Sequence, residues 1–157
     1  MEGKTILAVL AGGAVLTTLF AFKKKNDFTK VIEQMTIDVR NIRNLRLQGS
    51  QLLADIDLGI HNPTKYDMTV YTAGLITLKK IILFYKKVQI GSADSVKGED
   101  TFELPAYSHY LVTNITLTIK YLNVADQFIN HGLDGNMNNY TAQIYVNALG
   151  KNWVIEQ

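Results

Sequence analysis

The chain has 157 residues, 47% of them apolar and 19% charged, with a mean hydropathy of +0.03 and a formal net charge of +2. Such a composition excludes a disordered chain, which lacks the apolar surface that offsets its ordering entropy, and a protein that crosses a membrane many times. The sequence contains no cysteine, which excludes disulfides, thiolate metal sites and thiol catalysis.

The positive charge is concentrated at the N-terminus. The first 25 residues contain four lysines and one glutamate and carry +3, which leaves −1 for residues 26–157. The pI of 8.7 therefore describes the N-terminal segment and not the rest of the chain. Arg40, Arg43 and Arg46 recur every third residue, but no aromatic side chains alternate with them to stack on bases. We therefore expect no nucleic acid as a partner.

The segment from Thr5 to Phe22 has eighteen residues and no charge. A helix of that length spans about 27 Å, close to the roughly 30 Å of a bilayer core, so residues 1–25 are predicted to be a transmembrane anchor. Ala8 and Gly12 form a small-xxx-small pair that favours self-association, although small residues are common in membrane helices generally. The residues assigned to the anchor include Thr5, Ile6, Leu7, Gly12, Gly13, Leu19, Phe20 and Phe22.

A cleaved signal peptide is the main alternative to an anchor. Its cleavage site needs small residues after the apolar run, whereas this run ends in the bulky sequence Leu19–Phe22. Three lysines follow the run (Lys23, Lys24 and Lys25) and one precedes it. We therefore predict an uncleaved, single-pass anchor with these three lysines at the membrane edge and the following domain on the cytoplasmic side.

After the anchor, the pattern predicts a juxtamembrane linker or short helix over residues 26–34 and one domain over residues 35–157. Apolar residues first recur at helical spacing and then alternate with polar ones from Met35 onward. The clearest alternation runs from Leu52 to Asn62, with Ala54, Ile56, Leu58 and Ile60 on one face and Asp55, Asp57, Gly59 and His61 on the other. Asn62 and Pro63 then predict a turn.

Further strands are expected at Met68–Thr72, Leu75–Leu83, Phe84–Ile90, Thr101–Leu104, Tyr110–Lys120, Tyr140–Ala148 and Asn152–Ile155. In the strand Tyr110–Lys120, alternation places Val112 on the face of Asn114 and Thr116, opposite Leu111 and Ile115. A short helix is expected after Asn123, ending before Gly132. About seven short strands with turn residues between them predict an antiparallel β-sandwich.

Several sequence features together resemble one family. They are the apolar strand that runs into Asn62-Pro63-Thr64, the following Tyr66–Val70, the segments Val88–Ala93 and Leu104–Ser108, and the closing Tyr140–Ile155. This order resembles the group-two late-embryogenesis-abundant proteins, also called the WHy (water stress and hypersensitive response) domain family. The resemblance implies a fibronectin-like sandwich with one helix, no enzyme activity, and a stress-protective or scaffolding role at a membrane.

Catalytic and metal-binding patterns are weak. His61, His109 and His131 lie far apart in the sequence, so a metal site among them is not favoured. Asp55 and Asp57 share one strand face about 7 Å apart, a spacing that suits a glycosidase or a bound cation but is more often seen for solvated carboxylates. We therefore expect no catalytic residues, no cofactor, no metal and no small-molecule substrate.

Four lysines flank the apolar run Ile81–Tyr85: Lys79, Lys80, Lys86 and Lys87. If the run is an exposed tip, the lysines suit contact with anionic lipid or an acidic partner. If the run is a core strand, they are solubilising residues that protect it from aggregation. We favour the second interpretation.

Three hypotheses about function follow. The first is a non-enzymatic, single-pass membrane protein whose sandwich acts as a structural or interaction module, with the lipid bilayer and a protein as partners. The second is a structural protein of a membrane-containing virus or phage that tethers the lipid layer of the virion to its capsid. The third and least favoured is a cryptic hydrolase or metal enzyme that uses Asp55, Asp57 and a histidine.

Overall fold

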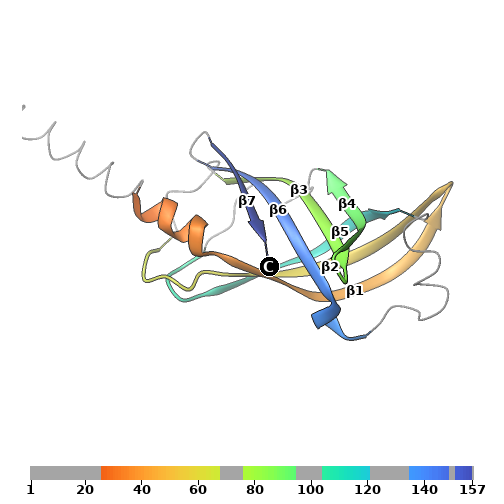
Figure 1. Ribbon diagram of the computed structural model, residues 1–157, viewed down its shortest axis with the longest axis horizontal. Coiled ribbons are helices and arrows are strands. Elements are labelled where there is room, and N and C mark those ends of the chain that lie inside the picture. The colour runs from red at the N-terminus through yellow and green to blue at the C-terminus, as the bar shows by residue number, and fades with distance from the viewer. Residues whose placement is uncertain (1–25, 68–75, 95–103, 121–134, 149–150, 157) are drawn as a thin grey trace, which may run out of the picture.

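A computed structural model describes residues 26–67, 76–94, 104–120, 135–148 and 151–156 (Figure 1). These residues form a helix over 26–34 and then seven antiparallel strands, which confirms the predicted all-β class. The strands are β1 (Thr36–Gln48), β2 (Gln51–His61), β3 (Ile76–Tyr85), β4 (Val88–Asp94), β5 (His109–Ile119), β6 (Tyr140–Ala148) and β7 (Lys151–Glu156), with a 3₁₀ turn η1 (Met137–Asn139) before β6.

The strands lie in the order β1-β2-β5-β4-β3-β6-β7. The sheet folds over itself, so that β6 and β7 contact β1 across the core (Figure 1). Strands β4 and β5 pair through two residue pairs, Gly91 with Ile119 and Ser92 with Thr118. A Cβ atom on Gly91 would lie 2.8 Å from Ile119 Cδ1 and 3.1 Å from the Thr118 carbonyl oxygen. Glycine therefore permits the close approach of these two strands.

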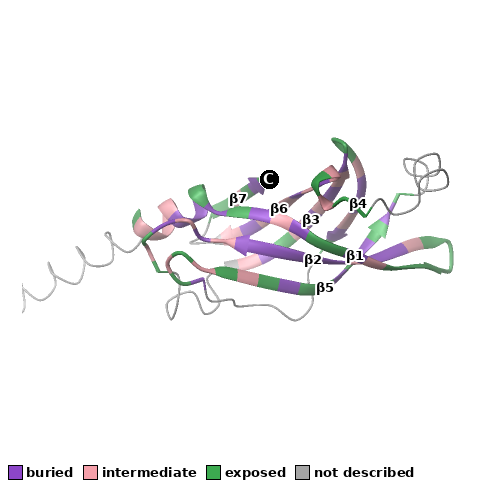
Figure 2. Cartoon of the chain, turned by 90° about the horizontal axis from the view of Figure 1, so that it is seen from below, coloured by how far each residue is buried: buried purple, intermediate pink, exposed green. Residues whose placement is uncertain are grey.

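The core fills the space between the inner faces of the folded sheet. The alternation predicted for β2 is confirmed, because Ala54, Ile56, Leu58 and Ile60 are each at most 1% exposed. Strand β3 contributes Ile81 and Leu83, which are fully buried. Figure 2 shows buried residues along the strands and exposed ones at the outer end of the β1–β2 hairpin, where Leu47 is 73% exposed.

The helix at residues 26–34 packs against this core. Val31 and Ile32 are 0% and 3% exposed, and Phe28 is partly buried against the core cluster. Met35 follows the helix and is also buried. The folded core therefore includes residues that precede position 35, where the sequence pattern had placed the start of the domain.

The face assignment predicted for the start of β5 is wrong. Val112 is buried, whereas Leu111 is 53% exposed. The cause is a β-bulge: between the pairs Ile56–Ile115 and Leu58–Val112, β5 has one residue more than β2. The bulge contains Asn114 with φ of 58°, a left-handed conformation that asparagine adopts more readily than most residues. The extra residue reverses the alternation on its N-terminal side.

The boundary predicted between Leu83 and Phe84 is also wrong. Strand β3 continues to Tyr85, and the turn falls at Lys86 and Lys87, whose φ angles are 46° and 70°. A two-residue hairpin turn needs positive φ at its central residues, which favours asparagine and glycine. Two lysines give no such signal in a sequence.

Several predictions fall outside the described residues: the anchor at 1–25, the strand expected at 68–72, residues 101–103 of the strand expected at 101–104, and the helix expected after Asn123. Within the part of the chain that the structure describes, no helix is long and apolar enough to cross a membrane.

We expect a chain that starts at residue 26 to fold, with a β-type circular dichroism spectrum and cooperative urea unfolding, because the core cluster begins at Val31. A chain that starts at residue 36 loses the buried Val31, Ile32 and Met35 and should lose about 5 kcal/mol of unfolding free energy.

A matched pair of substitutions separates packing from helix formation. V31A should lower the unfolding free energy by about 2 kcal/mol, whereas E33A on the exposed side of the same helix should change it little. Equal stability of the chains that start at 26 and 36 would contradict the docked position of the helix.

Candidate functional site

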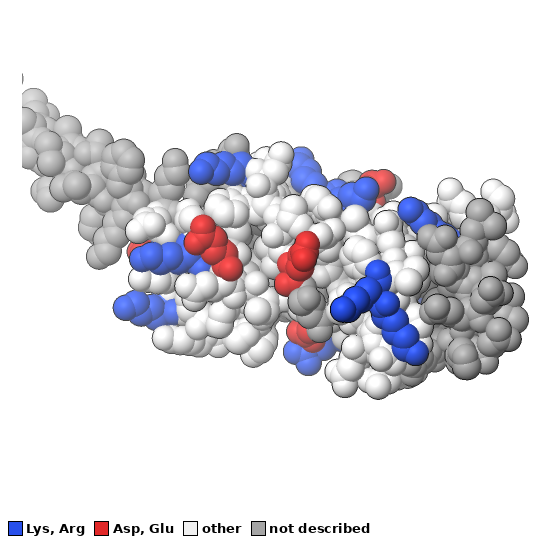
Figure 3. Space-filling view, in the orientation of Figure 1, with Lys and Arg blue, Asp and Glu red and all other residues white. Residues whose placement is uncertain are grey.

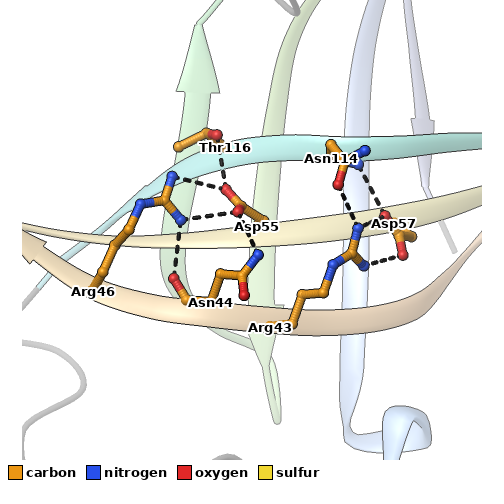
Figure 4. Close-up of polar contacts among 7 residues, drawn as sticks. All are labelled: Arg43, Asn44, Arg46, Asp55, Asp57, Asn114 and Thr116. Atoms are coloured by element: carbon orange, nitrogen blue, oxygen red, sulfur yellow. Dashed lines mark hydrogen bonds and ion pairs between the residues drawn. The ribbon is translucent and has the colours of Figure 1, made fainter.

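The outer face of β1, β2 and β5 carries a row of paired charged side chains, which we call the Arg–Asp ladder. It consists of Arg43 and Arg46 from β1 and Asp55 and Asp57 from β2, and Asn44, Asn114 and Thr116 complete its hydrogen bonds (Figure 4). The aspartate side chains are 13% and 12% exposed, so the interpretation of these residues as solvated carboxylates is wrong.

Asp55 accepts four hydrogen bonds. Arg46 binds it with both terminal nitrogens, Nη1 to Oδ2 at 2.9 Å and Nη2 to Oδ1 at 3.1 Å. Asn44 Nδ2 donates to Oδ2 at 3.0 Å, and Thr116 Oγ1 donates to Oδ1 at 2.8 Å. A carboxylate has about four acceptor positions, so the hydrogen-bonding capacity of Asp55 is filled by the protein itself.

Asp57 is bound in a similar way. Arg43 Nη2 donates to its Oδ1 at 2.9 Å, and Arg43 Nη1 donates to Oδ2. The backbone N–H of Asn114 also donates to Oδ1, at 2.9 Å, and Arg43 Nη2 reaches Asn114 Oδ1 at 2.6 Å. The bulge in β5 therefore supplies Asp57 with a backbone donor and Arg43 with an acceptor.

These contacts shift the pKa values in the ladder so that the charged form of each group is favoured. The hydrogen bond from Arg43 lowers the pKa of Asp57 against the opposing effect of burial. Burial alone would raise the pKa of Asp55, but hydrogen bonds from Asn44, Thr116 and Arg46 together lower it. The hydrogen bond to Asp57 in turn raises the pKa of Arg43. Both carboxylates are therefore ionised at neutral pH.

Two bulges in β1 bring the arginines to one face. In a regular strand, Arg43 would face away from Arg40 and Arg46, because side chains alternate. Strand β1 has one extra residue between Val39 and Asn41 and another between Arg43 and Arg46, relative to β2. Each extra residue reverses the alternation, so all three arginines lie on the outer face, where Arg40 pairs with the more exposed Asp38.

This arrangement is poorly suited to acid–base catalysis. A general acid needs a raised pKa, and a general base or cation ligand needs an accessible oxygen. Asp55 and Asp57 have lowered pKa values and are both held by arginines. The ladder instead fixes β1 and β5 against β2.

The structure brings two of the three histidines together. The rings of His61 and His109 are stacked, with centroids 4.1 Å apart and planes 10° apart, because the two residues are opposite each other on β2 and β5. His131 lies outside the described residues. Among the residues that the structure covers, no group of three or more His, Asp or Glu side chains is placed to hold a metal ion.

Asn62 is the centre of a buried hydrogen-bond network, which we call the Asn62 hub. Its side chain is 0% exposed. Nδ2 donates to the carbonyl oxygens of Tyr66, Leu104 and Pro105 at 2.7–3.2 Å, and Oδ1 accepts from the N–H and hydroxyl of Thr64. The predicted Asn62-Pro63 turn thus joins the loop after β2 to the loop before β5.

The four lysines around Ile81–Tyr85 do not form one cluster. Lys80 pairs with Asp94 at 3.6 Å, and Lys79 is exposed beside it, whereas Lys86 and Lys87 form the β3–β4 turn. Because Ile81 and Leu83 are fully buried, the run between the lysines is a core strand and not an exposed tip. Figure 3 shows basic and acidic side chains distributed along the visible face of the molecule.

Two shallow hollows lie on the outer surface of the sheet. One, of about 350 Å³, is lined by Arg40, Gly59, His109, Tyr110 and Leu111. The other, of about 260 Å³, is lined by residues of β3, β6 and β7 and by Lys87. The ladder carboxylates line neither of them.

Comparison with known proteins assigns no family to this chain. No family model and no curated relative matches the sequence. Among solved structures, a β-glucosidase from Paenibacillus barengoltzii is similar with a TM-score of 0.30 and 12% sequence identity. The match covers 78% of this chain and 13% of the enzyme. A TM-score of 0.30 carries no argument about fold or activity.

We expect N62A to lower the unfolding free energy by about 3 kcal/mol, because it leaves the Thr64 N–H and three carbonyl groups without their buried partner. N62D should be similarly destabilised, since a carboxylate would face three carbonyl oxygens. N152A, at an exposed asparagine, is the control and should change stability little. Urea unfolding measures all three, and equal values for N62A and N152A would contradict the hub.

The ladder also predicts how stability depends on pH. The pKa values of Asp55 and Asp57 are lower in the folded than in the unfolded state, so their stabilisation is complete above about pH 3.9 and is lost as the pH falls through the folded-state values. The double variant D55N/D57N should be less stable than the parent at pH 7, and its unfolding free energy should fall less steeply in acid. Parallel curves for the two proteins would show that the ladder does not contribute.

Proposed function

We propose that this protein is a non-enzymatic, single-pass membrane protein whose β domain serves as a structural or interaction module beside the bilayer. The observation that carries the proposal is the docked helix at residues 26–34, with Val31 and Ile32 buried in the core. This helix follows directly after the uncharged segment Thr5–Phe22 and the three lysines. A segment of that composition suits a bilayer, and the helix holds the domain close to it.

The occupied carboxylates support a non-enzymatic role. The residues that would carry hydrolysis, Asp55 and Asp57, are engaged by Arg46 and Arg43. To act on a substrate, either carboxylate would have to break a bidentate ion pair with an arginine of the adjacent strand. The same contacts suit a rigid module that presents a constant surface.

We further propose that the fold is a fibronectin-like sandwich of the late-embryogenesis-abundant, or WHy, type. The strand order supports this, since β1, β2 and β5 are neighbours, β4, β3, β6 and β7 are neighbours, and the two groups meet where β4 pairs with β5. The buried Asn62 adds support, because the Asn-Pro turn is part of the sequence resemblance.

Membrane fractionation tests the proposal. The full chain should stay with membranes after an alkaline carbonate wash, because a transmembrane helix is not extracted by it, and the chain that starts at residue 26 should appear in the soluble fraction. The variant K23Q/K24Q/K25Q is the matched control: it should remain in the membrane but lose the preference for placing the domain on the cytoplasmic side, as measured by protease protection.

Release of the full chain by the carbonate wash would refute the anchor. Cross-linking of the full chain in native membranes, followed by mass spectrometry, then tests the interaction module. The proposed role requires capture of a specific protein by the full chain.

A further inference from the structure

We propose that the end of the domain formed by the helix at 26–34 and the loops at 62–66 and 104–108 lies on the lipid headgroup layer, with Tyr107 and Lys65 at the contact. This inference rests on the proposed membrane anchor and specifies which surface of the domain meets the bilayer. We call this surface the helix end of the domain.

The three segments of the helix end are tied together by hydrogen bonds. Tyr107 N–H donates to the Thr64 carbonyl at 3.0 Å, and the Asn62 hub links the two loops from within. Lys30 on the helix donates to the Tyr66 hydroxyl at 3.3 Å. Because the helix is also packed against the core through Val31 and Ile32, the helix end moves with the domain as one unit.

The length of the connecting chain brings this unit close to the bilayer. Three residues separate Phe22, the last residue of the uncharged segment, from Asn26, the first described residue of the helix. A fully extended chain over these four steps spans at most about 14 Å. The uncharged segment and the helix end therefore cannot be far apart, and Figure 1 shows the helix, the first described element of the chain, at this end of the domain.

The side chains at the helix end suit a headgroup layer. Tyr107 is 68% exposed and lies in the turn before β5, where its φ is 55°. Lys65 is exposed, and the ammonium groups of Lys65 and Lys30 lie 5.7 Å and 5.0 Å from the centre of the Tyr66 ring. Tyrosine and lysine combine an apolar body with a polar tip, the property favoured at a membrane interface.

Acidic residues also occur on the segments of the helix end or directly after them: Asp27, Glu33 and Asp67. The contact therefore depends on the short connection and on the exposed tyrosine more than on attraction to anionic lipid. This commits the proposal to the headgroups of the same bilayer that holds the anchor, including zwitterionic ones.

The opposite end of the domain provides an internal control. Thr36 pairs with His61, and His61 pairs with His109, so the start of β1 lies at the helix end. Leu47 lies eleven residues further along β1, about 36 Å away for an extended strand, and is 73% exposed. Figure 1 places the β1–β2 turn at the far end from the helix.

The experiment uses the full chain reconstituted into phosphatidylcholine vesicles in which some headgroups carry a nitroxide. Because the chain has no cysteine, single variants K65C, Y107C and L47C can each be labelled at one position with a fluorophore. We expect the nitroxide to remove most of the fluorescence at positions 65 and 107 and to leave the fluorescence at 47 unchanged. The variant K65C keeps the test valid if Y107C fails to fold.

The outcomes separate this inference from the proposed function. Flotation of the labelled chain with vesicles but equal quenching at 47, 65 and 107 would overturn the placement of the helix end and leave the anchor intact. Failure of the chain to float would refute the anchor and, with it, the surface inferred here. Quenching at 47 alone would show that the domain meets the bilayer with its opposite end.

Discussion

The central physical constraint in this fold is that β2 is covered on both faces. Its inner face lies in the core, and its outer face carries Asp55 and Asp57, which are largely buried. A carboxylate removed from water must be paired and hydrogen-bonded, or it becomes costly to ionise. The two neighbouring strands supply these partners: β1 supplies the arginines and β5 supplies further hydrogen-bond donors. The buried carboxylates of β2 therefore determine which polar groups the strands on either side must present.

The same rule explains the Asn62 hub at one end of β2. A buried amide has donors and an acceptor to satisfy, and here they bind backbone groups of the loop after β2 and of the loop before β5. Both features are polar groups whose bonding capacity is filled within the protein. They therefore favour a single rigid arrangement, which suits a recognition or scaffolding role better than one that requires side chains to change partners during a reaction.

Alternation and turn residues were sufficient to predict the all-β class, the buried face of β2 and the turn at Asn62. They failed where the backbone inserts an extra residue. Arg43 and Asp57 could not be paired from the sequence, because regular alternation places Arg43 on the opposite face from Arg40 and Arg46. Of the two β1 bulges that correct this, only the one between Arg43 and Arg46 contains an asparagine with positive φ, Asn44; the β5 bulge has the same faint signal in Asn114. The turn at Lys86 and Lys87 leaves no signal in the sequence, because lysine is not a residue that favours positive φ.

The docked helix also has a mechanical consequence. A pulling force applied at the N-terminal side of the helix passes through the helix into β1. Strand β1 is held to β2 along nearly its whole length by backbone hydrogen bonds and by the ion pairs of the Arg–Asp ladder. If the far end of the β1–β2 hairpin is held, such a force acts along these strands, so that many bonds share the load at once. The pairing of β1 with β2 therefore makes this part of the domain resistant to force applied along the strands.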